Sequence, residues 1–291
     1  MINLVNDSWL AEHVEDPQTS IIDPRPRVKY LQGHVPRAVN LPLSEFYDKE
    51  TLGLHPEERL AEIFGKVGAD FDSTVALYDS YDGQSAAMLA WLLEYLGHPR
   101  VMILSNYLEG WVKHGGQILY RPVPAEPKIF GQKLGGRGRA LLNEVLLRGE
   151  SKLLDLRSED EFQGKISTEP RSGHIPGAVN LPWTELIGKE VQFFRPEQEQ
   201  RERITGVGIN LSDRVITYCS NGPRAAIGYV ALQQLGFENV RVYDGSFHEW
   251  ARKPELLLEQ GKIRLNPRVK PVAPTASPCV VQNLAGMAPA E

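Results

Sequence analysis

The sequence contains the same long pattern twice, and this repeat limits the possible folds more than any other feature. Residues 33–41 are GHVPRAVNL, and residues 173–181 are GHIPGAVNL. Further along, residues 86–97 (AAMLAWLLEYLG) match residues 225–236 (AAIGYVALQQLG) in length and in the position of the last glycine. Because an internal repeat fixes the architecture before any local detail, we expect a tandem duplication, with each unit roughly a hundred residues or slightly longer.

Each repeat alternates short strands with helical stretches. Residues 20–25 (SIIDPR) and 73–78 (STVALY) of the first unit correspond to residues 152–157 (KLLDLR) and 213–218 (DRVITY) of the second. Short runs of β-branched and aromatic residues predict buried strands. Strands that alternate with helices indicate a mainly parallel sheet with helices packed against it. The expected fold class is therefore α/β, with one such sheet in each of two tandem domains.

The boundary between the two units is visible in the sequence. Residues 117–136 hold three prolines and show no helical period, which predicts an extended linker. Residues 137–148 (RGRALLNEVLLR) predict an amphipathic helix that opens the second domain. The C-terminal residues, which include Cys279, predict a tail that is either poorly ordered or docked against a domain. The predicted division is an N-terminal domain (1–118), a linker (119–136), a C-terminal domain (137–263) and a tail (264–291).

Composition excludes several classes of protein. Hydrophobic residues make up 42% of the chain and charged residues 24%, as in soluble globular proteins. The formal net charge of −5 argues against a nucleic-acid binder that works through bulk positive charge. No apolar run is long enough to span a bilayer, and the N-terminus lacks the basic and apolar blocks of a secretory signal. With two cysteines in the chain, we expect no disulfide framework and a reducing, cytoplasmic setting.

The sequence predicts no metal site and no cofactor. His34, His174 and His248 fall in separate motifs, without the spacing that metal ligands require. No glycine-rich loop of the kind that holds a nucleotide is present either.

A cysteine in the second unit lies between a strand and a helix, at a position where a nucleophile is expected. The buried strand at 215–218 is followed by a tight loop, and a helix begins near Ala225. A helix N-terminus carries unpaired N–H groups and positive potential, and Arg224 adds a full charge, so both favour the thiolate of Cys219. The same N–H groups can hold an anion. A small buried apolar cysteine is the open alternative. The loop consists of Cys219, Ser220, Asn221, Gly222, Pro223 and Arg224.

The first unit has no thiol at the corresponding position. Aligning the strands places Asp79 opposite Cys219, whereas aligning the helices places Ser80 there, because the first loop is one residue longer. A duplication that keeps its nucleophile in one copy suggests that the other copy is catalytically inert and now supports the site. The two copies could also have diverged for unrelated reasons.

Taken together, these motifs resemble the two-domain rhodaneses of the thiosulfate and mercaptopyruvate sulfurtransferase family. The resemblance rests on the two Asp-x-Arg strand ends, the two Gly-His-Ile/Val-Pro motifs, the loop after Tyr218, and residues 243–246 (YDGS) followed by Trp250. It extends to about residue 262. It implies a rhodanese fold in each half, with the active site near the domain interface. It also implies that Cys219 takes the outer sulfur of a small anionic donor as a persulfide and passes it to cyanide or another thiol.

The resemblance further suggests which residues bind the donor. The loop residues from Ser220 to Arg224 are expected to hold it, and Arg171 matches a family arginine that binds its anionic end. Trp183 is a candidate to line the pocket, although such a tryptophan more often belongs to the core. Mercaptopyruvate-type members carry an arginine where this chain has Glu161, and a hydroxyl residue near the loop end where it has Arg224. Thiosulfate is therefore the expected donor, with mercaptopyruvate as the alternative.

Other functions remain open at this point. Phosphatases and arsenate reductases also place a cysteine and an arginine around an anion, but their loop is longer than the four residues between Cys219 and Arg224. A sulfur carrier that delivers a persulfide to a partner protein would share the same loop. A structural duplication with an inert thiol is the weakest alternative.

Overall fold

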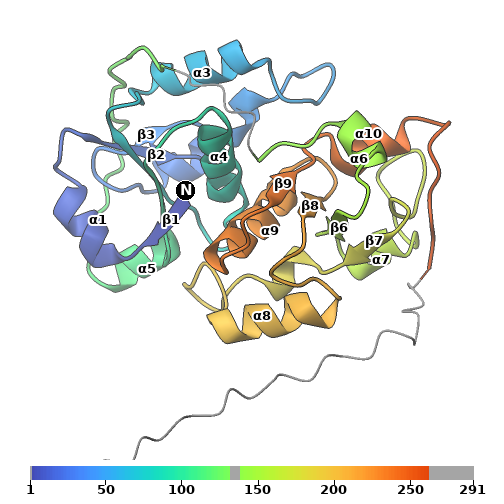
Figure 1. Ribbon diagram of the computed structural model, residues 1–291. Helices are drawn as coiled ribbons and strands as arrows, with labels where there is room; N and C mark the ends of the chain where they lie inside the picture. Colours follow the sequence, from blue (N-terminus) through green and yellow to red (C-terminus); the bar gives the residue numbers. More distant parts are fainter. Residues whose placement is uncertain (1, 132–137, 262–291) are drawn as a thin grey trace, which may run out of the picture. The chain divides into compact units, whose positions relative to one another are not determined.

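The computed structural model describes residues 2–131 and 138–261, and they form two parallel sheets flanked by helices (Figure 1). The expected α/β class with two repeated sheets is therefore confirmed. The predicted tail with Cys279, and residues 132–136 of the predicted linker, lie outside the described residues. Within the described ranges, no helix has the length and apolar character that crossing a bilayer requires.

The first sheet has the strand order β1-β5-β4-β2-β3, and every pair in it is parallel. Its strands are short and rich in Ile, Val and Leu, as expected for strands covered on both faces. The strands are β1 (Ile2–Val5), β2 (Thr19–Asp23), β3 (Val39–Asn40), β4 (Thr74–Leu77) and β5 (Val101–Leu104). The associated helices are α1 (Asp7–His13), α2 (Arg27–Leu31), α3 (Glu57–Lys66), α4 (Gln84–Tyr95) and α5 (Tyr107–Lys113), with a 3₁₀ turn at Leu43–Phe46.

The second sheet repeats this pattern with the order β7-β6-β8-β9, again all parallel. The register is also repeated, because Asp155 pairs with Asn180 as Asp23 pairs with Asn40. The strands are β6 (Lys152–Asp155), β7 (Ala178–Asn180), β8 (Val215–Tyr218) and β9 (Val240–Val242). The helices are α6 (Leu142–Leu146), α7 (Glu159–Phe162), α8 (Glu197–Gly206), α9 (Pro223–Gln234) and α10 (Ser246–Ala251), with a 3₁₀ turn at Trp183–Glu185.

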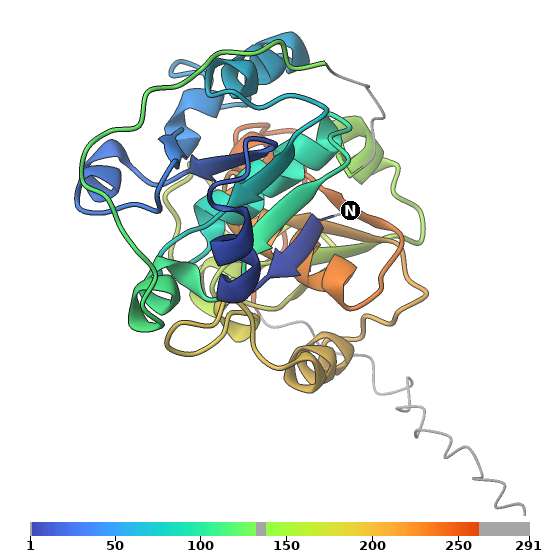
Figure 2. The ribbon, with the colours of Figure 1, turned by 90° about the vertical axis from the view of Figure 1, so that its left-hand side faces the viewer.

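Helices α4 and α9 pack against each other and join the two domains. In Figures 1 and 2, α1 and α5 cover one face of the first sheet, while α4 lies on the other face, next to α9. Side chains on every side of α4 are buried, because one side meets its own sheet and the other meets α9. The indole of Trp91 donates to the Gly138 carbonyl at 2.7 Å. One continuous core therefore includes residues of both domains.

The predicted helix at 137–148 is wrong for residues 138–141, and residue 137 lies outside the described residues. Helix α6 spans only Leu142–Leu146. Before it, Ala140 donates to the Val242 carbonyl and Val242 donates to the Gly138 carbonyl, both at 2.8 Å. This segment thus extends the edge of the second sheet beside β9, as β1 does beside β5 in the first. Pairing with a distant strand overrides the local helical pattern.

Candidate active site

Cys219 lies between the end of β8 and the start of α9, and its side chain is fully buried. Its Sγ accepts a hydrogen bond from the Gly222 amide at 3.2 Å. An amide that donates to sulfur stabilises a thiolate more than a thiol, because hydrogen bonds to charged groups are the stronger ones. Burial alone would also be expected of a small apolar cysteine. The main-chain donor directed at Sγ instead favours the nucleophile.

The N-terminus of α10 holds the backbone of Cys219. The Cys219 amide donates to Ser246 Oγ at 3.2 Å, and the Cys219 carbonyl accepts from the Phe247 amide at 3.0 Å. The His248 amide donates to the Ser220 carbonyl at 2.8 Å. Ser246 has a left-handed φ of 53°, a costly conformation for a residue with a side chain, as is common where a site must be fixed. Nothing in the sequence beyond the family motif indicates this role of Ser246.

Arg224 forms an ion pair with Glu161 beside the loop. Its two terminal nitrogens lie 2.7 Å and 3.0 Å from the Glu161 carboxylate oxygens, and one of them also donates to Ser220 Oγ at 2.6 Å. Both side chains are only 20% exposed. Burial on its own would raise the pKa of Glu161, but the hydrogen bonds and charge of Arg224, together with bonds from Ser158, lower it to about 2. The charge of Arg224 is therefore balanced next to Cys219.

The structure does not bring Arg171 to Cys219. The guanidinium of Arg171 donates to the carbonyls of Trp250, Ala251, Lys253 and Leu256 at 2.6–3.0 Å. It therefore caps the C-terminal end of α10, whereas the Cys219 loop contacts the N-terminal end. Trp183 lies in the 3₁₀ turn after Pro182 and packs, partly buried, against the core shared by the two domains.

The N-terminal domain touches the Cys219 loop at two places. The Tyr47 hydroxyl donates to the Asn221 carbonyl at 3.1 Å. Gly222 has a φ of 114°, and a Cβ placed on it would lie 3.0 Å from the Cε of Met88, on α4. Burial first, and then the charges of Cys219 and Asp244, raise the pKa of Tyr47 well above its usual value. These contacts support the hypothesis that the first domain now stabilises the site of the second.

Asp79 occupies the position of Cys219 in the first domain. Its carbonyl accepts from the Leu108 amide at 2.9 Å, as the Cys219 carbonyl accepts from Phe247. This contact decides between Asp79 and Ser80, the two alignments that the sequence leaves open. The Asp79 carboxylate accepts from the Ala86 and Ser80 amides. Burial first, and then the charge of Asp82, raise the pKa of Asp79 to about 7.

Asp79 should make the stability of the protein depend on pH. Its folded-state pKa of about 7 lies above the ordinary value of 3.8, so the folded protein retains a proton that the unfolded chain releases. This contribution is complete below about pH 3.8 and is lost as the pH rises through about 7. Between these limits, the unfolding free energy of wild type should fall with pH more steeply than that of Asp79→Asn, by about 1 kcal/mol per pH unit. Urea unfolding at about pH 5 and about pH 7 measures both slopes, and equal slopes would contradict the assignment.

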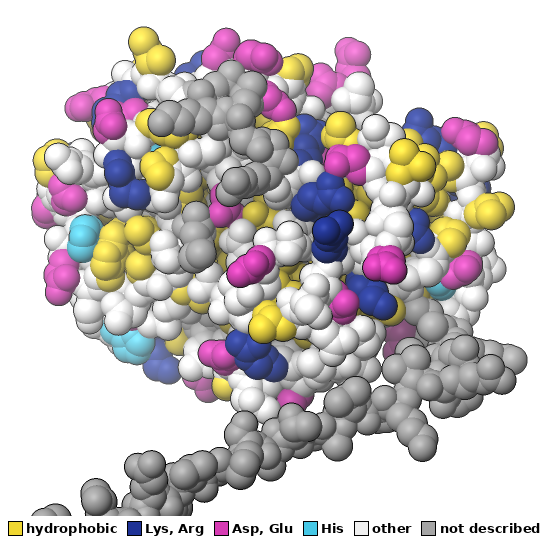
Figure 3. Space-filling view, viewed as in Figure 1, with side chains coloured by type: hydrophobic (Ala, Val, Ile, Leu, Met, Phe, Trp, Pro, Cys, Tyr) yellow, Lys and Arg dark blue, Asp and Glu magenta, His cyan; other side chains and the backbone are white. Residues whose placement is uncertain are grey.

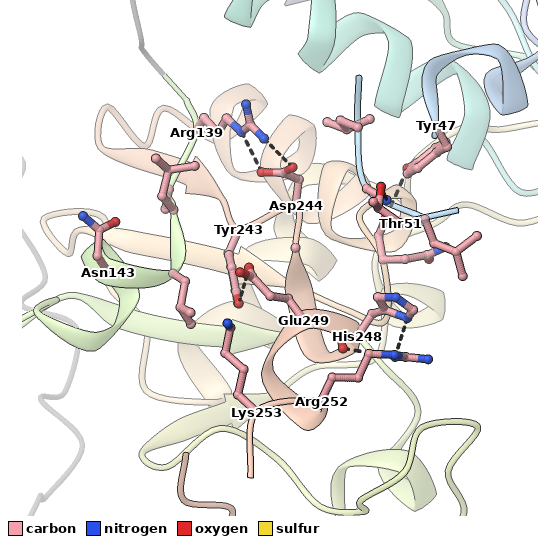
Figure 4. Close-up of a pocket in the computed structure, with 18 residues that line it drawn as sticks. Tyr47, Thr51, Arg139, Asn143, Tyr243, Asp244, His248, Glu249, Arg252 and Lys253 are labelled. Atoms are coloured by element: carbon pink, nitrogen blue, oxygen red, sulfur yellow. Dashed lines mark hydrogen bonds and ion pairs between the residues drawn. The ribbon is translucent and has the colours of Figure 1, made fainter. Parts of the chain in front are cut away.

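A cleft of about 710 Å³ lies beside the Cys219 loop (Figure 4). One wall is the hairpin from Tyr47 to Leu54 of the first domain, which closes with a bridge between these two residues. The other walls are residues 139–143 and α10 with the residues on either side of it. Asn221 and Gly245 also line the cleft, so it reaches the loop that contains Cys219.

A family model describes the same two repeats. The model of the rhodanese-like domain matches residues 6–114 and again residues 140–253. The chain belongs to the rhodanese family.

Named relatives of this rhodanese align with it over nearly its whole length. It is 30% identical to the 3-mercaptopyruvate sulfurtransferase of Escherichia coli over 284 residues, covering 89% of this chain and 98% of the relative. It is also 30% identical to the thiosulfate sulfurtransferase of Corynebacterium glutamicum over 282 residues, covering 90% and 92%. The sulfur carrier protein TtuD of Thermus thermophilus is 27% identical over 277 residues, covering 89% and 97%.

Two functional features of this rhodanese were missed from the sequence. The ion pair joins Glu161 and Arg224, which are 63 positions apart. The one indication of this ion pair in the sequence is that both residues depart from the same family pattern. The contact from Tyr47 crosses between domains over 174 positions, and no sequence signal indicates it.

Proposed function

We propose that this rhodanese is a sulfurtransferase that uses thiosulfate as its donor and Cys219 as its nucleophile. The observation that carries the proposal is the buried Sγ of Cys219 with the Gly222 amide directed at it. A thiolate stabilised in this way can attack sulfur and then leave again, as covalent catalysis requires. Because the thiol must stay reduced, the proposal also places the protein in a reducing compartment such as the cytoplasm.

The reaction has two steps in this proposal. The Cys219 thiolate attacks the outer sulfur of thiosulfate, the bond between the two sulfur atoms of thiosulfate breaks, and sulfite leaves with the electron pair. The outer sulfur then remains on Cys219 as a persulfide. In the second step cyanide or a thiolate attacks that sulfur, and Cys219 leaves as a thiolate. The loop residues Ser220, Asn221, Gly222 and Arg224 hold the anions, and Pro223, which has no amide hydrogen, contributes only shape.

The choice of thiosulfate follows from the charges near the loop. In thiosulfate the anionic oxygens are attached to the atom that is bonded to the outer sulfur, so amides close to Cys219 can bind them. In mercaptopyruvate a methylene and a carbonyl group separate the sulfur from the carboxylate, which requires a cation further from the loop. Glu161 places an ionised carboxylate beside Arg224, and Arg171 is occupied by main-chain carbonyls. In this proposal Arg171 is a structural residue and Trp183 a core residue.

Intact mass measurement tests the proposal. After mixing with thiosulfate, the protein should gain one sulfur, about 32 Da, and lose it on addition of cyanide. The Cys219→Ser variant should gain nothing. An adduct with mercaptopyruvate alone would reverse the choice of donor. No adduct with either compound would overturn the sulfurtransferase assignment.

A persulfide carrier is the second candidate, and the name of the Thermus thermophilus relative supports it. Carrier and enzyme differ in how long the persulfide persists. Rapid, repeated turnover with cyanide favours the enzyme, whereas a stable persulfide that only a partner protein discharges favours the carrier.

A further inference from the structure

An ion pair between Arg139 and Asp244 lies close to the segment that holds Cys219. Arg139 Nε and one of its terminal nitrogens each donate to a different oxygen of the Asp244 carboxylate, both at 2.8 Å (Figure 4). The side chain of Asp244 is only 8% exposed and that of Arg139 is 21% exposed. Burial alone would lower the pKa of Arg139, but the hydrogen bonds and charge of Asp244 raise it. A bidentate pair of this kind fixes both the position and the orientation of the carboxylate.

Asp244 begins the short segment that contacts the backbone of the nucleophile. Two residues later, Ser246 Oγ accepts from the Cys219 amide at 3.2 Å. The next two amides along the chain donate to carbonyls of the Cys219 loop, at 3.0 Å and 2.8 Å. Arg139 therefore anchors the start of the same segment, residues 244–248, whose remaining contacts hold Cys219 in place.

The domain without the cysteine has no such ion pair at the corresponding place. In the aligned repeats, Ser105 occupies the position of Asp244. Leu4 pairs with β5 at the position where Arg139 pairs with β9, so Leu4 corresponds to Arg139. A serine and a leucine cannot form an ion pair. The pair therefore belongs to the half of the molecule that carries the nucleophile.

The fold does not need this ion pair to form the turn. Tyr107 in the first domain has a φ of 51°, close to the 53° of its counterpart Ser246. The Leu108 amide donates to the Asp79 carbonyl at 2.9 Å, and the corresponding amide in the second domain donates to the Cys219 carbonyl at 3.0 Å. Because the same backbone arrangement forms in a domain without the pair, we attribute the pair to a requirement of the nucleophile.

Asp244 also places a negative charge near the thiolate. The Tyr47 hydroxyl lies close to both groups, because the charges of Cys219 and Asp244 add to the rise in its pKa that burial causes. Within the described part of the chain, Arg139 is the one cation within ion-pair distance of the Asp244 carboxylate. Without Arg139 this carboxylate would be unbalanced, and a nearby like charge would disfavour the thiolate.

The other charged groups near Asp244 are not placed to replace Arg139. His248 and Arg252 both bind Glu169. Figure 3 shows Lys and Arg side chains gathered near the middle of this face with acidic side chains beside them, as expected where charges are balanced in pairs. The charged or titratable side chains that line the cleft besides the ion pair are Tyr47, Tyr243, His248, Glu249, Arg252 and Lys253.

We propose that Arg139 is a positioning residue for the nucleophile. Through Asp244 it fixes the segment that holds the Cys219 backbone, and it balances a carboxylate that would otherwise disfavour the thiolate. Both effects act through Asp244, so Arg139 does not need to touch the sulfur donor. This inference rests on the proposed role of Cys219 as nucleophile and adds a residue on which the reactivity of Cys219 depends.

A pH titration of the Cys219 thiolate in the full chain tests the inference. Ultraviolet absorbance follows the thiolate, and subtracting the Cys219→Ser form of each variant removes the signals of Cys279 and the tyrosines. In Arg139→Leu, the pH midpoint of thiolate formation should rise by about one unit, because the Asp244 carboxylate has lost its partner. Arg139→Lys keeps the positive charge and should restore most of this shift.

Replacing the carboxylate separates charge from position. Asp244→Asn leaves Arg139 unbalanced, so the midpoint should fall instead of rising. In the double variant Arg139→Leu/Asp244→Asn both charges are absent, and the midpoint should return close to that of wild type. Persulfide formation from thiosulfate, measured at a pH where the thiolate is complete, should nevertheless stay about tenfold slower in the double variant, because the segment is no longer anchored.

Arg203→Leu is the matched control. Arg203 also pairs with a carboxylate of the second domain, that of Glu185 at 3.0 Å, but it lies on α8 and does not line the cleft. Its thiolate titration should equal that of wild type. If Arg139 served only the stability of the fold, Arg139→Leu would unfold at lower urea concentration with an unchanged midpoint, and that result would overturn the inference. Should Arg139→Leu fail to fold, an Asp244→Asn variant with the wild-type midpoint and persulfide rate would overturn it instead.

The titration does not depend on sulfur transfer, so the two proposals fail separately. A wild-type protein that forms no persulfide with thiosulfate or mercaptopyruvate would overturn the proposed function, while the titrations would still decide whether Arg139 supports the thiolate. A persulfide in wild type together with unchanged midpoints in Arg139→Leu and Asp244→Asn would overturn the role of Arg139 alone.

Discussion

Replacing Arg224 by leucine should lower kcat/KM with thiosulfate by about a hundredfold, or about 2.7 kcal/mol. The substitution removes a cation beside Cys219 and leaves the Glu161 carboxylate, which is only 20% exposed, without its partner. The unbalanced negative charge should repel both the thiolate and the anionic donor. It should also lower the unfolding free energy by about 2 kcal/mol, because a partly buried charge loses its partner. Steady-state kinetics and urea unfolding measure the two effects.

The double variant Arg224→Leu/Glu161→Gln is the matched control. It removes both charges and keeps a side-chain oxygen that can accept from the Ser158 amide, so most of the lost stability should return, while the loss of activity should be only partly repaired. Complete recovery of activity would show that the Arg224 guanidinium does not contact the donor. A single variant whose stability and activity both remain within error of wild type would contradict the importance of the ion pair.

Replacing Gly222 by valine should have the second large effect. The φ of 114° at this position is one that side chains rarely adopt, and a Cβ would lie 3.0 Å from Met88 and 3.3 Å from the Tyr47 hydroxyl. The loop must then shift and withdraw the amide that donates to Cys219. We expect at least a hundredfold loss of persulfide formation and a loss of about 2–4 kcal/mol in stability. Stopped-flow kinetics and chemical unfolding give the two values.

A second substitution separates backbone strain from crowding. Combining Gly222→Ala with Met88→Ala removes the nearest obstacle and leaves the unfavourable φ together with the looser contact to the Tyr47 hydroxyl. If crowding by α4 dominates, this pair should be more active than Gly222→Ala alone. If strain dominates, the two should have the same activity. Wild-type activity in Gly222→Val would contradict any role for the tight contact between domains.

The sequence was sufficient to predict the repeat, the parallel sheets and the position of Cys219 after a strand. These features depend on local patterns, such as the β-branched run before Cys219 and the matching motif around His174. It was not sufficient where partners lie far apart. The helix predicted from residue 137 fails because Ala140 pairs with β9, about a hundred positions away. The guanidinium of Arg171 is similarly held by carbonyls more than 75 positions later.

The contacts between the two domains are reciprocal, as they are between the subunits of a symmetric dimer, although both domains belong to one chain. Helix α4 packs on α9, Tyr47 reaches the loop of the second domain, and Phe193 packs on Gly83 in the loop of the first. Such reciprocal contacts are what an isologous pair of identical subunits makes. Fusion of such a pair would give a chain with two equal sites. One site could then lose its nucleophile while its domain kept the surface that contacts the other domain. A domain separated from its partner would expose an apolar helix to water, so each half should be less stable alone than in the full chain.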